Sequence, residues 1–186
     1  MRVVLCSGNE HKRAELATLA PGWAIELLEV DGYPEETGET YYENALAKAR
    51  YGRQVGPADA VMLGEDSGIE VAGLGGEPGV RSARFAAGEP VRMLLAALRE
   101  IDGDGRRARY VSELVWLEPG GTKRRGTGVL AGVIAREPRG SGGFGYDPIF
   151  VPDGETRTVA ELGNAWKREH SHRARAALAL LDALAA

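Results

Sequence analysis

A chain of 186 residues, 44% of them hydrophobic and 27% charged, can bury a core and is most simply one globular unit. Its net charge of −4 argues against a broad grip on DNA or RNA, although a metal ion and local cations can still make one pocket attractive to an anion. Cys6 is the only cysteine, which excludes an internal disulfide and a cysteine-based zinc site.

The N-terminal segment predicts a cytoplasmic protein that begins with a buried strand. The apolar run Val3–Cys6 is too short for a signal peptide, and no longer apolar run follows that could span a membrane. This run predicts a strand over 2–7. Asn9 is a good N-cap for the helix that follows, which is expected to extend to Leu19.

The next elements are predicted from apolar runs and from helix-capping residues. A second strand is expected over 23–30. Thr40-Tyr41-Tyr42-Glu43 matches a capping box, which predicts a helix with a small-residue face that ends near Val55. The run 60–63 predicts a buried strand, the polar segment Glu65–Gly68 is expected to mark its end, and 69–71 is expected to be extended again.

The second half of the chain predicts a hairpin and two further helices. Pro90 fits the first turn of a helix, and 108–117 with 127–135 predict an antiparallel pair. The segment 171–184 predicts an amphipathic helix whose apolar stripe consists of Ala174, Ala177, Leu178, Leu181 and Leu184. Strands and helices are intermixed, which is typical of an α/β fold with a long mixed β-sheet flanked by helices.

The segment Ser7-Gly8-Asn9-Glu10-His11-Lys12 joins the first strand to the first helix. A helix N-terminus offers amide N–H groups and a partial positive charge to a phosphate, and Lys12 adds a full charge. The spacing of a P-loop is missing, so a plain strand–turn–helix with a surface lysine is the alternative interpretation.

Two acidic segments are candidates for a metal site. Glu36 lies in an acidic loop and Asp66 follows a buried strand, and magnesium prefers carboxylate and water oxygens. Side chains alternate along a strand, so Glu65 and Asp66 should point in opposite directions, one toward a ligand and one toward a supporting partner. A solvated acidic loop and a simple strand end with an Asx turn are the alternatives.

Two later segments could recognise a nucleoside. Gly142–Asp147 interleaves aromatic residues with glycine, and such rings can stack on a base. Lys167 and Ser171-His172-Arg173 bring cations to the start of the last helix, where they oppose the helix dipole and so favour an anionic or carbonyl-bearing ligand. An ordinary turn and solvated basic residues are the alternatives.

Taken in order, these segments resemble the inosine triphosphate pyrophosphatase family, also called the Ham1 or non-canonical purine NTP pyrophosphatase family. The resemblance extends from Val3 to about Leu181. Each match is weak alone, but together and in order they are highly specific: Ser7 to Glu15, Glu36 to Ala49, Glu65 to Ile69, Pro78 to Phe85, Gly142 to Phe150, Ala160 to Leu162 and Lys167 to Arg173.

The resemblance implies a single two-lobed domain over residues 1–186, with a nucleotide-binding cleft between the lobes, that forms a homodimer. It implies Mg²⁺-dependent hydrolysis of a nucleoside triphosphate between its α and β phosphates. The implied substrates are ITP, dITP and XTP, so the role would be to cleanse the nucleotide pool of deaminated purines. Neither a nucleic acid polymer nor a membrane is an expected partner.

The resemblance also implies residue roles. Asp66 would be the catalytic, water-activating acid and a metal ligand, and Glu36 would support the metal. The implied substrate-binding residues are those at the phosphates (Ser7, Gly8, Asn9, Glu10, His11, Lys12), the substrate contact Ser67, those around base and sugar (Phe144, Gly145, Tyr146, Asp147), and those at the base edge and nearby phosphate (Lys167, His172, Arg173).

Three positions depart from the family pattern. Glu65 stands where aspartate is common, which keeps the charge. Arg81 replaces a frequent tyrosine, and Asn164-Ala165-Trp166 stands where acidic residues are usual, so both bear on substrate preference. Two alternatives remain: a related Maf-type pyrophosphatase, which the Ser-His-Arg segment disfavours, and a regulatory nucleotide-binding protein without turnover, which the retained acids and Lys12 disfavour.

Overall fold

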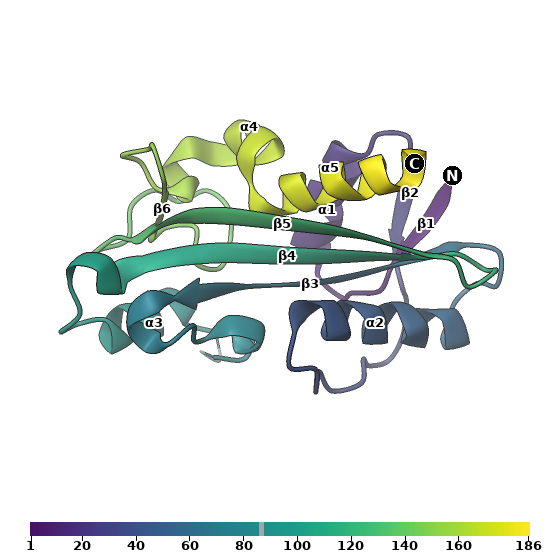
Figure 1. The fold of residues 1–186 in the computed structure, drawn as a ribbon, viewed down its shortest axis with the longest axis horizontal. Helices are drawn as coiled ribbons and strands as arrows, with labels where there is room; N and C mark the ends of the chain where they lie inside the picture. The colour runs from purple at the N-terminus through teal and green to yellow at the C-terminus, as the bar shows by residue number, and fades with distance from the viewer. Residues whose placement is uncertain (86–87) are drawn as a thin grey trace. The chain divides into compact units, whose positions relative to one another are not determined.

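The computed structural model describes residues 1–85 and 88–186 (Figure 1). Over these residues the chain forms a six-stranded mixed sheet in the order β2-β1-β3-β4-β5-β6. Strand β1 is parallel to both of its neighbours, β2 and β3, whereas β5 is antiparallel to β6. The strands are β1 (Arg2–Leu5), β2 (Ala24–Leu27), β3 (Val61–Val71), β4 (Arg107–Leu117), β5 (Lys123–Ile134) and β6 (Phe150–Pro152). The predicted mixed α/β fold is confirmed.

The chain divides into two compact units. Unit 1 comprises Met1–Asp66, Ser112–Gly128 and His172–Ala186, and unit 2 comprises Ser67–Val111 and Val129–Ser171. The strands β3, β4 and β5 each begin in one unit and end in the other. The nucleotide-binding cleft stays a prediction.

Unit 1 is a three-layer arrangement with helices on both faces of its strands. Figure 1 shows α2 (Tyr41–Val55) on one face and α1 (Glu10–Leu19) and α5 (His172–Ala185) on the other. Alternate strand residues supply the two cores, so Leu63 packs in the cluster with α1 and α5 while Met62 packs in the cluster with α2. Each face of these strands is therefore covered by helix.

Two glycines let helices lie close to the strands of unit 1. A Cβ atom built on Gly64 would lie 1.9 Å from the Ala45 carbonyl oxygen of α2. One built on Gly128 would lie 1.9 Å from the His172 carbonyl oxygen at the start of α5. Because no side chain fits in either place, both helix contacts depend on glycine.

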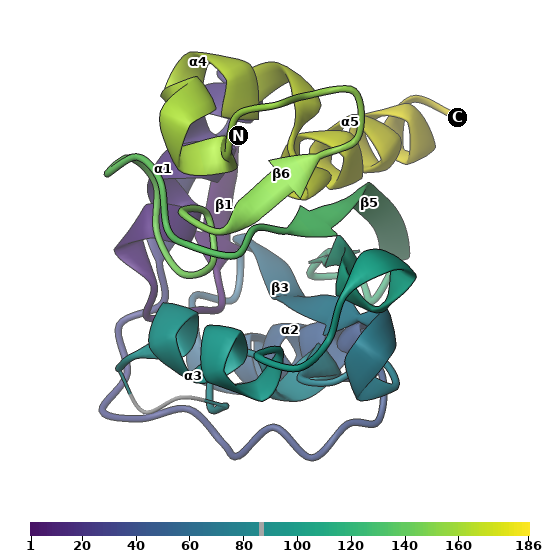
Figure 2. The same cartoon turned by 90° about the vertical axis from the view of Figure 1, so that its left-hand side faces the viewer.

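Unit 2 has its own core. Figure 2 shows α3 (Pro90–Ala97) and α4 (Val159–His170) on opposite sides of the strands of this unit. Leu94, Tyr110, Phe150 and Val159 belong to one buried cluster. The remaining short elements are 3₁₀ helices over Ala72–Leu74, Gly79–Arg81 and Gly103–Arg106.

Local capping predictions are confirmed. Asn9 caps α1 by accepting the Lys12 N–H, and Thr40 with Glu43 forms the reciprocal capping box of α2. Pro90 stands in the first turn of α3. No helix within 1–85 or 88–186 is long and apolar enough to cross a membrane.

The structure differs from the predicted secondary structure in three places. The extended backbone predicted over 69–71 is confirmed, but the predicted strand end at Glu65–Gly68 is wrong: β3 continues through it, because both acidic side chains find partners on the flanking helices. The helix α4 was not expected, although Thr158 and Glu161 form a capping box at its start. On α5 Ala174 and Ala177 of the predicted stripe are buried, but Leu178 is 57% exposed and Leu180 takes its place in the core.

Candidate active site

Two predicted metal-binding carboxylates of unit 1 meet at one lysine. The Lys48 Nζ atom of α2 lies 2.8 Å from Oδ1 of Asp66 and 2.5 Å from Oε1 of Glu36. Asn44, one turn earlier on α2, donates to the other oxygen of Asp66 at 3.2 Å and accepts the Gly38 N–H at 2.8 Å. The helix thus brings the loop that carries Glu36 and the strand that carries Asp66 to the same place.

The environment of Asp66 suits a base. Burial raises the pKa of the Asp66 carboxyl, the Lys48 ammonium opposes this increase, and the charges of Glu36 and Glu65 add to it. The net effect places the pKa of Asp66 above its usual value. A carboxylate with a raised pKa accepts a proton from water more readily than an ordinary aspartate does.

The donor set here fits a magnesium ion that is held together with a phosphorylated substrate. Within the described part of the chain, no three His, Cys, Asp or Glu side chains form a group able to hold a metal by themselves. Glu36 and Asp66 nevertheless converge on a single cationic atom. Magnesium commonly takes one or two protein carboxylates and completes its shell with water and substrate phosphate oxygens.

A second network of unit 1 surrounds Glu65, whose side chain is fully buried. Its Oε2 lies 2.6 Å from Lys12 Nζ of α1, and its Oε1 accepts Arg173 Nη2 of α5 at 3.0 Å. Ser112 donates to the same Oε1 at 3.3 Å, and Arg173 also pairs with Glu15. Glu65 therefore faces α1 and α5 while Asp66 faces α2, which confirms the predicted alternation of the two side chains.

The strand register places the predicted phosphate segment beside these acids. Leu5 of β1 pairs with Leu63 of β3, and the Cys6 N–H donates to the Leu63 carbonyl at 2.9 Å. The turn that follows is held by the Asn9 N–H, which donates to Ser7 Oγ at 3.2 Å. Glu10, by contrast, is exposed and forms an ion pair with Arg13.

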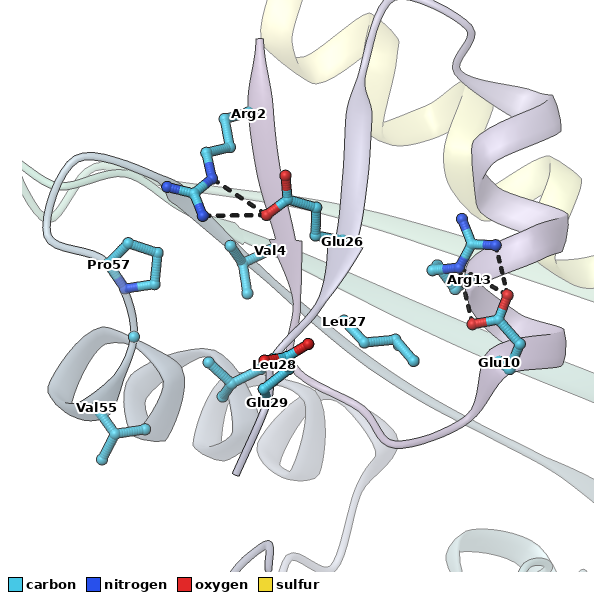
Figure 3. Close-up of a pocket in the computed structure, with 11 residues that line it drawn as sticks. Arg2, Val4, Glu10, Arg13, Glu26, Leu27, Leu28, Glu29, Val55 and Pro57 are labelled. Carbon is cyan, nitrogen blue, oxygen red and sulfur yellow. Dashed lines mark hydrogen bonds and ion pairs between the residues drawn. The ribbon is translucent and has the colours of Figure 1, made fainter. Parts of the chain in front are cut away.

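A surface pocket of about 510 Å³ lies elsewhere in unit 1, beside β2. Figure 3 shows the Arg2–Glu26 and Arg13–Glu10 ion pairs on its walls. Of the predicted binding residues, Glu10 lies on its wall.

Unit 2 contains a compact group around Asp147. The buried Asp147 accepts the Phe144 N–H at 3.0 Å and the Lys167 Nζ at 2.8 Å through Oδ2, and the Tyr110 hydroxyl at 3.3 Å through Oδ1. The Lys167 Nζ also lies 4.7 Å from the centroid of the half-buried Phe144 ring. A ring, a cation and a carboxylate are thus held together by the glycine-rich loop and α4.

The sequence model of the Ham1 family matches residues 3–183. The chain belongs to the Ham1 family. It is 46% identical to the dITP/XTP pyrophosphatase of Symbiobacterium thermophilum, over 100% of this chain and 95% of that protein. It is 44% identical to the dITP/XTP pyrophosphatase of Thermus thermophilus, over 98% and 91% of the two chains.

Solved structures agree with this assignment to the Ham1 family. The HAM1 protein from Coxiella burnetii matches with a TM-score of 0.85 and 36% identity, over 100% of this chain and 98% of that chain. A nucleoside-triphosphatase / dITP/XTP pyrophosphatase from Mycobacterium abscessus matches with a TM-score of 0.75 and 40% identity, over 97% and 99% of the chains. The predicted resemblance is confirmed.

The predicted site residues fall into the two units of this Ham1 chain. Unit 1 holds those predicted at the metal and the phosphates, together with the first turn of α5: Ser7, Gly8, Asn9, Glu10, His11, Lys12, Glu36, Asp66, His172 and Arg173. Unit 2 holds Ser67 and those predicted around the base: Phe144, Gly145, Tyr146, Asp147 and Lys167. Their roles stay predictions.

Sequence reasoning assigned no role to several residues that hold these groups together. Asn44 and Lys48 are four positions apart on α2, so they share a helix face, and both contact Asp66. Glu15 follows Lys12 by three positions on α1 and reaches Arg173. The spacing on each predicted helix was the available signal, since residues three and four apart are neighbours.

The Glu65 network predicts a specific loss of stability in acid. Burial raises the pKa of Glu65, but Lys12 and Arg173 outweigh this effect and hold the pKa well below its usual range. The stabilisation is therefore present above the unfolded-state pKa of about 4.3 and is lost as the pH falls toward the folded-state value. Urea unfolding should show that Glu65→Gln is less stable than the unmutated protein at pH 7, and that this difference shrinks below about pH 4. A difference that stays constant down to pH 3 would contradict the assignment.

Proposed function

We propose that this protein hydrolyses the non-canonical purine nucleoside triphosphates ITP, dITP and XTP to the monophosphate and pyrophosphate, and so removes deaminated purines from the nucleotide pool. The observation that carries this proposal is the convergence of Glu36 and Asp66 on one cationic atom. Relatives that match nearly the whole chain and are named dITP/XTP pyrophosphatase support it.

In this proposal Asp66 accepts the proton of the attacking water and, with Glu36, would hold Mg²⁺. Magnesium would neutralise charge on the triphosphate and orient it for attack. Lys12 lies at the start of α1, where its ammonium and the helix N-terminus both favour phosphate. Lys48 keeps the two carboxylates together, and Asn44 fixes the orientation of Asp66.

The groups of unit 2 are proposed to recognise the purine. The Phe144 ring offers a face for stacking, and Lys167 and Asp147 offer a donor and an acceptor beside it. Hypoxanthine and xanthine carry a 6-oxo acceptor where adenine has an amino donor. A donor close to the base, such as a backbone N–H, would pair with that oxygen and be left unpaired against adenine. We further propose that the protein acts as a homodimer in the cytoplasm.

The proposal predicts strong discrimination among purine nucleotides. ITP, dITP and XTP should exceed ATP in kcat/KM by about 10- to 100-fold, because an unpaired buried donor costs about 1–3 kcal/mol. GTP shares the 6-oxo group, so its rejection must occur at the 2-amino group. Since XTP carries an oxygen there, an acceptor must be tolerated and an amino donor refused at that position.

A panel of these triphosphates, assayed for pyrophosphate with Mg²⁺, checks this prediction. The magnesium requirement is tested in the same assay by adding a chelator and then restoring the metal. Comparable kcat/KM values for ATP, GTP and ITP would overturn the proposed role in cleansing the nucleotide pool.

A further inference from the structure

The segment Pro78–Phe85 is part of the Ham1 pattern, yet neither the proposed chemistry nor the purine contacts give it a role. It contains the 3₁₀ helix Gly79–Arg81 and ends on a turn, all within unit 2. Ser82 is its buried polar residue, with 7% of its surface exposed. A buried serine needs partners for its hydroxyl and backbone groups, and here those partners lie on two segments of the candidate site.

The Ser82 hydroxyl joins this turn to β3. Its Oγ accepts the Ile69 N–H at 2.8 Å and donates to the Gly79 carbonyl at 2.6 Å. Ile69 is itself fully buried and lies two positions after Ser67, on the same face of the strand. The hydroxyl therefore fixes the turn to the strand next to a predicted substrate contact.

The Ser82 carbonyl joins the same turn to the purine loop. It accepts the Tyr146 hydroxyl at 3.0 Å. Tyr146 is 5% exposed and packs in the core of unit 2, so its ring is fixed on one side by packing and at its tip by this bond. Burial raises the pKa of Tyr146 to about 12, so the hydroxyl keeps the proton that it donates.

The position of Tyr146 determines the positions of the groups proposed to recognise the base. The next residue is Asp147, whose Oδ2 holds both the Phe144 N–H and the Lys167 ammonium. A shift of Tyr146 would move the Asp147 carboxylate and, with it, the ring and the cation that it holds. Ser82 is thus connected through Tyr146 to the groups proposed to recognise the purine, and none of these contacts involves a carboxylate proposed to bind metal.

We infer that Ser82 is a positioning residue that sets the geometry of the Phe144–Asp147 purine loop through Tyr146, and so determines nucleoside affinity and not the rate of the chemical step. This inference rests on the proposed function, in which that loop encloses the purine. It deepens the proposal by naming the residue outside the loop on which purine recognition depends.

The test compares Ser82→Ala, Tyr146→Phe, the double variant and Thr122→Ala, which removes a hydroxyl from an exposed residue between β4 and β5 and serves as control. Calorimetry with Mg²⁺ measures the dissociation constants of IMP and of pyrophosphate separately. We expect both single variants to weaken IMP binding by about 10-fold, which corresponds to about 1.4 kcal/mol, while pyrophosphate binding stays within about two-fold. The double variant should resemble the singles, because both changes loosen one link.

Steady-state kinetics on ITP should also show an effect on binding and not on the chemical step, with KM raised and kcat little changed in both single variants. Unchanged IMP binding in Ser82→Ala and Tyr146→Phe would overturn the inference, as would equal weakening of IMP and pyrophosphate, which would indicate general damage. Tyr146→Phe keeps the ring in the core, so it tests the link even if Ser82→Ala fails to fold. The calorimetric binding measurements do not require turnover. If the unmutated protein fails to hydrolyse ITP, that result therefore counts against the proposed function and not against the role of Ser82.

Discussion

Replacing Asp66 with asparagine is expected to lower kcat for ITP by about 10²-fold or more, which is the scale of a general-base contribution. Asparagine keeps the shape of the side chain and can still accept a hydrogen bond from Lys48, which now lies 2.8 Å from Asp66 Oδ1. It loses the negative charge that would hold Mg²⁺ and take a proton from water. The measurement is initial-rate release of pyrophosphate from ITP at saturating substrate.

The matched control for this variant is Asp153→Asn. Asp153 is exposed and pairs with Arg107, so its replacement should leave kcat within about two-fold and cost little stability. Thermal unfolding should show that both variants remain folded. If Asp66→Asn hydrolyses ITP at nearly the unmutated rate, then Asp66 is not the base and the assignment of the site is wrong.

Replacing Arg173 with methionine is expected to lower the free energy of unfolding by about 3–5 kcal/mol, the usual cost of removing one partner from a buried ion pair. The Arg173 side chain is 2% exposed and pairs with Glu65 and Glu15, and methionine would keep much of its length without the charge. Glu65, which is fully buried, would then keep Lys12 and the Ser112 hydroxyl as partners but lose its arginine. Urea unfolding at pH 7 measures the loss.

Arg175→Met is the control, since Arg175 is an exposed residue of the same helix and its replacement should cost less than about 1 kcal/mol. The double variant Glu65→Gln/Arg173→Met should recover part of the loss, because it no longer leaves a buried carboxylate without its arginine. Two purely additive losses, or a cost for Arg173→Met as small as the control, would show that the pair does not hold α5 to β3.

Elements with strong local signals could be predicted from the sequence. The caps at Asn9 and Thr40 are local hydrogen bonds between residues three apart, so they need no knowledge of the fold. The same logic could have found α4 from Thr158 and Glu161, but Gly163 has a positive φ inside this helix and interrupts its pattern.

The continuation of β3 through Glu65 and Asp66 could not be predicted in this way. Two adjacent carboxylates normally oppose burial in a strand, because an unpaired buried charge is costly. Here Glu65 pairs with Lys12 and with Arg173, which lies 108 positions along the chain, and Asp66 pairs with Lys48 at a separation of 18. These distant residues decide the local structure, and only the fold brings them together.

The candidate site likewise combines features that the local sequence indicates with features that depend on distant residues. Motif resemblance indicated Glu36 and Asp66 as metal ligands, but no property of either residue alone indicates that both contact Lys48. The Asp147 group likewise depends on Tyr110 of β4 and Lys167 of α4. The sequence shows the residue types that carry the chemistry and the helical spacing of Asn44 and Lys48, but only the fold shows which carboxylates these positioning residues contact.

The most direct test of the proposed reaction is the identity of the first products from ITP. Purified protein is mixed with ITP and Mg²⁺, and nucleotides, pyrophosphate and phosphate are quantified separately over the first few per cent of conversion. Cleavage between the α and β phosphates predicts IMP and pyrophosphate in equal amounts from the earliest time point, without IDP. IDP and single phosphate as the primary products would contradict it.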